Sequence, residues 1–204
     1  MGHESENMDV KRSGAQQQGA MVVFVGAEST GKSTLAQHLA QQQGAGFVPE
    51  IGRFIWEEKQ GRLSADDYVE IAERHRAAED AARAQASSPW IFVDTNALTT
   101  LLLGLCFGQV SEPVPPALLR YADDCRSRYL HHFVCADDIP YEEQPGVREN
   151  AGWRTHIQRL VLEDLDRRGI AYTVLTGTLQ ERAAKVMAVL AGSRQDGPLT
   201  RAAA

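Results

Sequence analysis

The sequence has little of several things that mark particular classes of protein. Only three cysteines occur among its 204 residues, Cys106, Cys125 and Cys135, and no two of them form a C-x-x-C pair. This pattern argues against a disulfide framework and a zinc knuckle, and it favours a reducing, cytoplasmic location. The longest mostly apolar stretch, residues 97–107, is far shorter than the roughly 20 residues that span a bilayer. We therefore expect neither export nor a membrane partner.

Positive charge is also scarce. The chain has 21 basic and 27 acidic side chains, a formal net charge of −6 and a pI near 5.5. A net-acidic chain is not built to hold a nucleic-acid backbone, so we expect no nucleic-acid partner. The hydrophobic fraction of 43% and the charged fraction of 24% are ordinary for a globular protein. One folded domain is the default expectation for this length.

The chain divides into three segments. Residues 1–20 lack an apolar h-region and predict a polar, disordered leader, and residues 193–204 predict a flexible tail. In the domain between them, residues 21–192, short apolar runs alternate with helical patterns. We expect strands at 21–25, 47–48, 90–94, 129–135 and 171–175, and helices at 32–43, 52–59, 64–86, 98–107, 117–126, 153–168 and 179–190. This alternation predicts an α/β fold with a five-stranded parallel sheet between helical layers.

The strongest chemical signal is a G-x-x-x-x-G-K-S segment, residues 26–33, placed between the first strand and the first helix. Glycines let the backbone wrap an anion, and the N–H groups of the loop and the helix N-terminus face the phosphates. Lys32 reaches the β/γ oxygens, and Ser33 offers a hydroxyl to Mg²⁺. The nucleotide contacts are expected from Gly26, Glu28, Ser29, Thr30, Gly31, Lys32, Ser33 and Thr34.

Two acidic residues follow other predicted strands. Asp94 ends the apolar run 90–93, and an acid at that position of a P-loop enzyme holds or orients the magnesium shell. Helix N-capping is the alternative for Asp94. Glu50, with Arg53, follows the second strand and is expected to converge with Asp94 on the phosphate loop, where it could take a proton from a substrate hydroxyl. The alternative for Glu50 and Arg53 is a surface i,i+3 ion pair.

The polar segment 137–152 contains proline and glycine and has no hydrophobic period, so we interpret it as a loop or short lid. Arg148 and Arg154 flank its junction with the next helix. A mobile arginine that closes over the transferring phosphoryl group would stabilise its charge, although most arginines of a chain are solvated surface residues. Tyr68 and Ile71, in the long third helix, are interpreted as helix packing.

Several classes of P-loop protein do not fit the chain. None of its three asparagines, Asn7, Asn96 and Asn150, begins an N-K-x-D guanine-reading motif, which disfavours a switch GTPase. The chain has no L-S-G-G-Q-like transporter signature and is too short for an AAA+ module with its helical lid domain. A small-molecule kinase that uses ATP and Mg²⁺ remains.

Six segments together resemble one family. They are Gly-Ala-Glu-Ser-Thr-Gly-Lys-Ser-Thr-Leu-Ala at 26–36, Val-Pro-Glu-Ile-Gly-Arg at 48–53, Asp-Asp-Tyr at 66–68, Phe-Val-Asp-Thr-Asn at 92–96, Asp-Ile-Pro-Tyr at 138–141 and Arg-Glu-Asn at 148–150. In this order they are similar to the nicotinamide riboside kinase domain of the NadR type, a family sometimes catalogued as AAA-like ATPases. The resemblance spans about residues 22–191.

The resemblance implies phosphoryl transfer from ATP to the 5′-hydroxyl of nicotinamide riboside (NR), giving nicotinamide mononucleotide for NAD biosynthesis. It implies catalytic roles for Lys32, Asp94, Glu50 and Arg148, metal contacts from Ser33 and Asp94, and substrate contacts from Glu50, Arg53, Asp94, Asp138, Tyr141 and Arg154. The chain departs from the family pattern at 141–146 and at Asn96, both on the expected substrate side. A kinase for another nucleoside or small alcohol, or a regulatory ATP-binding module, remains open.

Overall fold

The computed structural model describes residues 19–141 and 151–195. Most of the predicted leader and tail lies outside the described residues, as do Arg148 and the segment 142–150. The predicted loop 137–152 is therefore described only at its two ends. Of these ends, residues 151–152 already belong to a helix rather than to a loop.

The described chain contains five strands and seven helices. The strands are β1 (Ala20–Val25), β2 (Gly46–Val48), β3 (Trp90–Asp94), β4 (His131–Cys135) and β5 (Tyr172–Leu175). The helices are α1 (Lys32–Gln43), α2 (Ile51–Glu58), α3 (Ala65–Ala84), α4 (Ala97–Cys106), α5 (Pro116–Arg128), α6 (Ala151–Arg167) and α7 (Leu179–Gln195). Residues 193–195, predicted as part of the tail, are helical.

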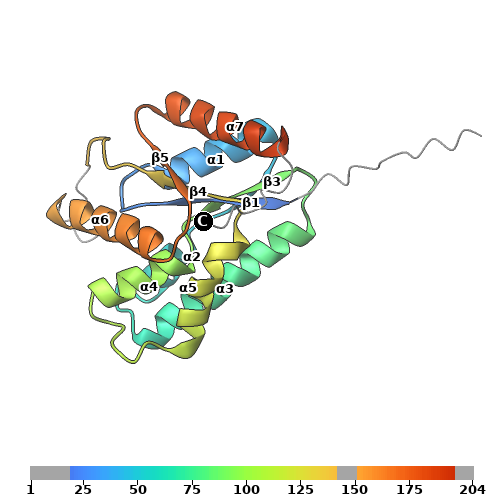
Figure 1. Ribbon diagram of the computed structural model, residues 1–204. Helices are drawn as coiled ribbons and strands as arrows, with labels where there is room; N and C mark the ends of the chain where they lie inside the picture. The colour runs from blue at the N-terminus through green and yellow to red at the C-terminus, as the bar shows by residue number, and fades with distance from the viewer. Residues whose placement is uncertain (1–18, 142–150, 196–204) are drawn as a thin grey trace, which may run out of the picture.

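The five strands form one parallel sheet in the order β2-β3-β1-β4-β5. The central strand β1 pairs with β3 and with β4, and its Phe24 lies opposite Asp94 of β3. Figure 1 shows α1 and α7 over one face of the sheet and α3, α4 and α5 over the other. The predicted three-layer α/β fold is confirmed. Because the strands are parallel, their carboxyl ends meet at one edge, where ligands of such sheets bind.

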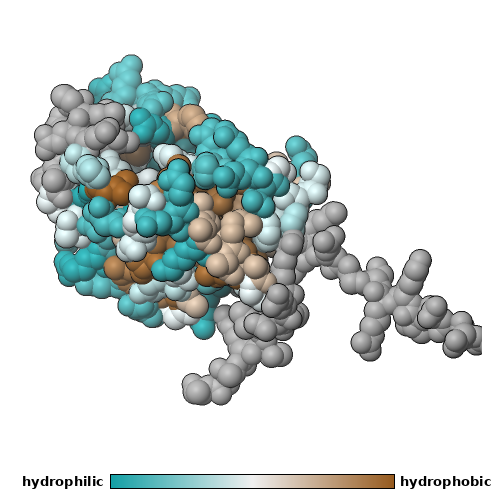
Figure 2. All heavy atoms as spheres, turned by 90° about the horizontal axis from the view of Figure 1, so that it is seen from above, coloured by the Kyte–Doolittle hydropathy of each residue, from teal (hydrophilic) through white to brown (hydrophobic). Residues whose placement is uncertain are grey.

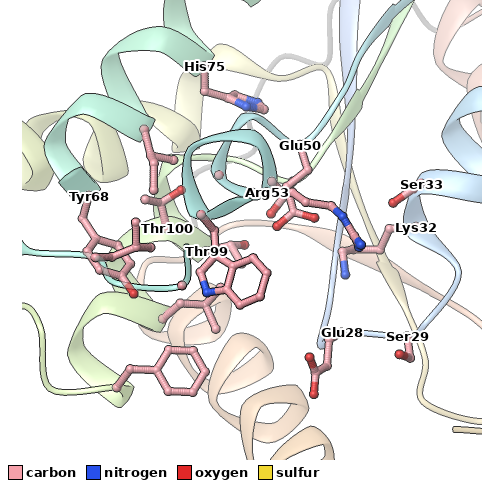
Figure 3. A pocket seen from close by; sticks show the side chains of 18 of the residues that line it. Glu28, Ser29, Lys32, Ser33, Glu50, Arg53, Tyr68, His75, Thr99 and Thr100 are labelled. Atoms are coloured by element: carbon pink, nitrogen blue, oxygen red, sulfur yellow. The ribbon is translucent and has the colours of Figure 1, made fainter. Parts of the chain in front are cut away.

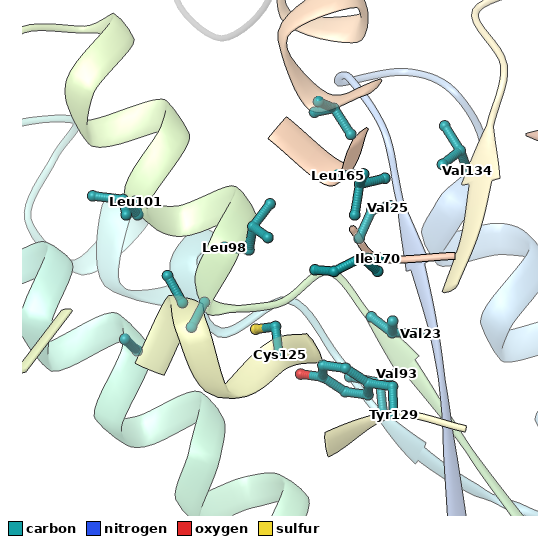
Figure 4. Close-up of a cluster of buried hydrophobic side chains, with 14 of the residues drawn as sticks. Val23, Val25, Val93, Leu98, Leu101, Cys125, Tyr129, Val134, Leu165 and Ile170 are labelled. Atoms are coloured by element: carbon teal, nitrogen blue, oxygen red, sulfur yellow. The ribbon is translucent and has the colours of Figure 1, made fainter. Parts of the chain in front are cut away.

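Alternate residues of β1 feed two separate hydrophobic cores. Val22 and Phe24 pack with α1 and α7, whereas Val23 and Val25 pack with α3 to α6, and all four side chains are fully buried. Figure 4 shows part of the second core, in which Leu98, Cys125 and Leu165 approach the strands. A strand covered on both faces has a continuous apolar run, which is why residues 21–25 carry no polar alternation.

Local sequence signals place the helices beside the site. Helix α3 begins with a capping box, in which Ser64 Oγ accepts from the Asp67 backbone N–H and Asp67 Oδ2 accepts from the Ser64 N–H at 2.7 Å. The hydrogen bonds that Ser64 donates to the Asp67 carboxylate lower the pKa of Asp67 to about 2. Helix α5 begins with Pro116, as expected for a residue that has no N–H to donate.

The face of the molecule that lies above α1 and α7 in Figure 1 is covered by hydrophilic residues interrupted by smaller hydrophobic areas (Figure 2). Such mixed cover is ordinary for a folded domain. Within residues 19–141 and 151–195, no helix combines the length and apolar composition that crossing a membrane requires.

Candidate functional site

The phosphate loop connects β1 to α1 in a conformation that requires glycine at both ends. Gly26 has φ 136° and Gly31 has φ 81°, backbone conformations that L side chains rarely adopt. A Cβ atom on Gly26 would lie only 2.7 Å from the Cys135 carbonyl oxygen at the end of β4. The two motif glycines therefore let the loop curl tightly over the carboxyl end of the sheet.

Lys32, the lysine of the motif, crosses the inside of this loop. Its Nζ donates to the Ala27 carbonyl oxygen at 2.6 Å, and Thr30 Oγ1 donates to the same oxygen at 2.8 Å. Lys32 is buried, whereas Ser33 and Thr34, at the start of α1, are exposed. The loop thus presents an ammonium group and two hydroxyls where a phosphate chain would lie.

Gln158 of helix α6 braces the loop. Its Oε1 accepts from the Ala27 N–H at 2.8 Å, and its Nε2 donates to the Cys135 carbonyl oxygen at 3.0 Å. Gln158 is itself buried. The amide therefore ties the segment after β1 to the end of β4, and it satisfies backbone groups that would otherwise be buried without partners.

Two buried arginines also hold the loop. Arg154 donates to the Ile139 carbonyl oxygen at 2.9 Å and to the Ser29 carbonyl oxygen at 3.1 Å. Arg182 of α7 donates to the Thr30 carbonyl oxygen at 2.6 Å and pairs with Asp138. Both of these hydrogen bonds of Arg154 are to the protein's own backbone, and its guanidinium also lies over the Tyr141 ring, 5.6 Å from the centroid. Its predicted role as a lid arginine stays a prediction. Gln158 and Arg182 belong to no sequence motif.

The segment after β4 contacts the phosphate loop as well. Asp138 accepts from the Gly177 N–H at 2.7 Å, in addition to its pair with Arg182. These contacts outweigh the effect of partial desolvation and lower the pKa of Asp138. Tyr141 Oη donates to Glu28 Oε1 at 3.1 Å. Both residues, predicted to contact substrate, lie beside the loop, and that role stays a prediction.

A cavity of about 910 Å³ extends from the phosphate loop between α2, α3 and α4. Figure 3 shows Glu28, Ser29, Lys32 and Ser33 on one side and Tyr68, Thr99 and Thr100 on the other, with Glu50 and Arg53 between. The wall away from the loop is largely aromatic and aliphatic. Its large side chains are Trp56, Leu63, Tyr68, Ile71, Leu103 and Phe107.

Asp94 is the last residue of β3 and is only 2% exposed. Within the described residues, its Oδ1 is buried without a hydrogen-bond partner. The N-cap of α4 is Asn96, whose side chain accepts from the Thr99 N–H at 3.1 Å. The N-cap alternative for Asp94 is therefore wrong, and a buried carboxylate oxygen is left without a structural task. Such an orphan is costly unless a ligand satisfies it.

Glu50 occupies the N-cap position of α2 and lines the cavity. Burial raises its pKa; Lys32 opposes this rise, and Asp94 adds to it. The structure therefore brings Glu50, Lys32 and Asp94 within electrostatic reach of one another. Arg53 also lines the cavity, but its Nε pairs with Glu57 Oε1 at 3.0 Å, so the alternative of an i,i+3 surface pair with Glu50 is wrong.

Sequence reasoning missed much of the cavity wall. Tyr68 and Ile71, interpreted as packing residues, belong to the core and also line the cavity. Thr95 lines it too and has φ 65°, a strained conformation for a β-branched residue. The only sequence signal for Thr95 was its place in the quoted Phe-Val-Asp-Thr-Asn segment, residues 92–96. Trp56, Thr99 and Thr100 had no signal beyond their helical positions.

The residues present fit a magnesium ion that would be held mainly by a bound nucleotide. Among the described residues, no group of three or more His, Cys, Asp or Glu side chains could hold a metal by itself. Mg²⁺ typically keeps several waters and takes phosphate oxygens plus one or two protein ligands. The unpartnered Asp94 oxygen and the exposed Ser33 hydroxyl supply donors of that kind.

Comparisons with known proteins agree with this architecture. A NadR protein in complex with NR aligns with a TM-score of 0.65 at 19% identity, covering 93% of this chain and 55% of that one. The YorR protein of Bacillus subtilis aligns at 0.56 and 14% identity, covering 87% of this chain and 98% of that one. Thymidylate kinase from Candida albicans aligns at 0.55 and 13%, covering 88% and 94%.

At these identities the structural likeness establishes the fold, which is that of P-loop kinases. The chain spans about half of the NadR chain, 55% of its length. No curated protein sequence matches the chain significantly. A family described as an AAA domain matches residues 21–182. Because that match extends over most of the sequence and includes the phosphate loop, the chain belongs to the AAA domain family.

Proposed function

We propose that the protein is an ATP-dependent kinase that transfers the γ-phosphoryl group of ATP to the 5′-hydroxyl of a nucleoside, and that the nucleoside is nicotinamide riboside. One observation carries the proposal. The phosphate loop opens directly into a cavity of about 910 Å³, with Glu50 beside both and an unpartnered carboxylate oxygen on Asp94 nearby. A module that only binds ATP needs no such second compartment.

The loop and its lysine would hold the nucleotide. Backbone N–H groups from Gly26 to Thr34 and the N-terminus of α1 would bind the phosphates, and Lys32 would leave the Ala27 carbonyl to reach the β and γ oxygens. Ser33 and Asp94 would hold Mg²⁺, which would neutralise charge on the phosphate oxygens. Most of the rate enhancement would then come from positioning and charge stabilisation.

Glu50 would act on the acceptor hydroxyl. The hydroxyl oxygen attacks the γ-phosphorus, the bond from that phosphorus to the β–γ bridging oxygen breaks, and ADP departs. Glu50 accepts the hydroxyl proton, and its raised pKa makes it a better base than an ordinary surface glutamate. Asp94 and Glu50, at the ends of neighbouring strands, would orient the reacting oxygen between them.

The aromatic wall supports a nucleoside rather than a small aliphatic alcohol. Trp56, Tyr68 and Phe107 offer ring faces to a flat base, and the hydroxyls of Thr99 and Thr100, which donate to Asn96, can still accept hydrogen bonds from its polar edges. The choice of nicotinamide riboside rests on the resemblance of the six sequence segments to NadR-type kinases. Structural likeness to a NadR protein in complex with NR accords with it.

A product assay tests the proposal. Purified protein is incubated with γ-labelled ATP, Mg²⁺ and, separately, nicotinamide riboside, adenosine, cytidine, thymidine and shikimate. We expect labelled nicotinamide mononucleotide at the highest kcat/KM of the panel. Transfer to another nucleoside would replace the acceptor while keeping the kinase, whereas ATP binding without transfer to any acceptor would favour a regulatory module.

A further inference from the structure

Helix α3 presents one polar side chain to the cavity among apolar neighbours. Tyr68, Ile71 and His75 follow one another along the same face of the helix and all line the cavity. His75 is only 3% exposed. Figure 3 shows its ring near Glu50, and the two groups lie within electrostatic reach of one another. Its place is thus beside the proposed reaction centre.

A second buried group lies beside the ring. His75 Nε2 lies 3.4 Å from Oε1 of Glu79, one helical turn further along α3, although within the described residues the atom has no hydrogen bond of good geometry. Glu79 is 1% exposed, and it also pairs with Arg128 and accepts from Tyr129 Oη. Burial alone would raise the pKa of Glu79, but the contacts of His75, Tyr129 and Arg128 lower it. Glu79 is therefore a charged acceptor next to Nε2.

This arrangement determines which ring nitrogen of His75 can accept a hydrogen bond from a ligand. A neutral imidazole carries one proton, and a carboxylate beside Nε2 favours the tautomer with the proton on that atom. Nδ1 then has a free lone pair and can only accept a hydrogen bond.

We propose that His75 is a specificity-determining residue that accepts a hydrogen bond from a sugar hydroxyl of the acceptor through Nδ1, and that Glu79 sets the tautomer that makes this possible. The inference rests on the proposed function. Because Glu50 would face the reacting 5′-hydroxyl and His75 lies next to Glu50, the group that reaches His75 belongs to the same sugar ring. The 2′- and 3′-hydroxyls are the donors that a ribose supplies there.

The test compares nicotinamide riboside with its 2′-deoxy and 3′-deoxy analogues as acceptors for the wild type and for His75→Ala, His75→Asn and His75→Gln. The wild type should prefer the riboside over one analogue by about 10- to 100-fold in kcat/KM. His75→Ala should lose that preference, with an unchanged KM for ATP. Asparagine places a side-chain oxygen near the position of Nδ1, so His75→Asn should restore part of it. Glutamine reaches the position of Nε2 instead and should not.

Two further variants separate recognition from folding. Glu73→Gln changes an exposed residue of the same helix that does not line the cavity, so its preference should equal that of the wild type. Glu79→Gln should weaken the preference while the KM for ATP stays unchanged, and a melting curve identifies any variant that has lost the fold. His75→Asn keeps the test open if Glu79→Gln unfolds.

The outcomes are distinguishable. Three results would overturn this inference and leave the kinase in place. One is an unchanged preference in His75→Ala, and another is an equal loss of activity on all three acceptors. The third is a preference for the amide of the base, measured by comparing nicotinamide riboside with nicotinic acid riboside. Failure of the wild type to phosphorylate any nucleoside would overturn the proposed function and this inference together.

Discussion

The two ends of the cavity are built in different ways. At the phosphate end, one continuous segment, residues 26–34, supplies the proposed contacts, mainly through backbone N–H groups and one lysine. At the acceptor end, the wall is made of side chains from α2, α3 and α4, which lie far apart in the sequence. The first end is a short motif, and the second exists only in the folded chain.

This difference follows from what each end would recognise. A triphosphate is the same in every ATP molecule, so a loop of backbone N–H groups with one lysine suits any kinase of this fold. Acceptors differ in shape and polar groups, so recognition depends on individual side chains. Changes at the phosphate end should therefore abolish turnover with every acceptor, whereas changes at the acceptor end should alter KM and selectivity.

Lys32→Ala is expected to have the largest effect. The variant loses the cation that would bind the β and γ oxygens, and kcat should fall by about 10²-fold or more with every acceptor. Lys185→Ala, which removes an exposed lysine bonded to the Val174 carbonyl, is the matched control and should retain full activity. Steady-state kinetics with purified variants provide the measurement, and a normal kcat in Lys32→Ala would contradict the phosphate-loop assignment.

Asp94→Asn should separate activity from stability. The amide keeps the shape of the side chain but is a poor ligand for Mg²⁺, so kcat should fall by about 10²-fold. The same change replaces a buried carboxylate whose Oδ1 has no hydrogen-bond partner within the described residues, so the free energy of unfolding should rise by about 1 kcal/mol.

Urea denaturation and kinetics on one preparation test both signs for Asp94→Asn. The exposed Asp66→Asn serves as a control that should alter neither. A loss of stability without a loss of kcat would indicate that Asp94 has a structural role only.

Glu50→Gln tests the proton acceptor between the two ends. Because the pKa of Glu50 is raised by burial, kcat should increase as the pH rises through a midpoint above the ordinary value of 4.5. Glu50→Gln should lower kcat, raise the acceptor KM and remove this acid limb. Glu57→Gln, on the exposed part of the same helix, should keep the wild-type pH profile.

The folded-state pKa of Glu50 also has a consequence for stability. Since the folded protein holds this proton more tightly than the unfolded chain, the contribution of Glu50 to stability is present at low pH and is lost as the pH rises through the raised pKa. Glu50→Gln should remove this part of the pH dependence in denaturation experiments. A pH profile of unfolding that is identical in both proteins would show that Glu50 has an ordinary pKa.

Gln158→Leu should have the smallest effect on kcat and a clear effect on stability. It leaves the Ala27 N–H and the Cys135 carbonyl without their buried partner, which should cost about 2 kcal/mol and lower the melting temperature by about 4–8 °C. The KM for ATP should rise several-fold, because the loop loses a brace. Gln41→Leu, at an exposed position of α1, is the control.

Much of the fold could be predicted from the sequence because the signals are local. The apolar run 21–25 predicted the central strand, and the helix expected at 64–86 begins at the capping box of Ser64 and Asp67. Helix α1 begins and ends where the pattern placed it, at Lys32 and Gln43. Helix α7 continues to Gln195, beyond its last strongly apolar residues, because exposed helical turns need no apolar pattern to persist.

The site was less predictable because its parts meet only through tertiary contacts. Glu50 and Asp94 could be located from strand ends, since parallel strands bring those ends together. Gln158 and Arg182 could not, because a side chain that satisfies a distant backbone group looks like any other polar residue on a helix. Trp56 showed only the helical spacing that packing residues share, and Tyr68 showed that spacing and its place in the quoted Asp-Asp-Tyr segment.

By itself, the sequence determined the phosphate loop, the alternation of strands and helices, and the acidic residues at strand ends, because each depends on neighbours within a few residues. Only the tertiary structure decided that Asn96 rather than Asp94 caps α4, that Arg154 holds the loop's own backbone, and that His75 and Glu79 lie buried beside the cavity. These outcomes depend on which groups the packed helices bring within hydrogen-bond distance, and no local pattern encodes that distance.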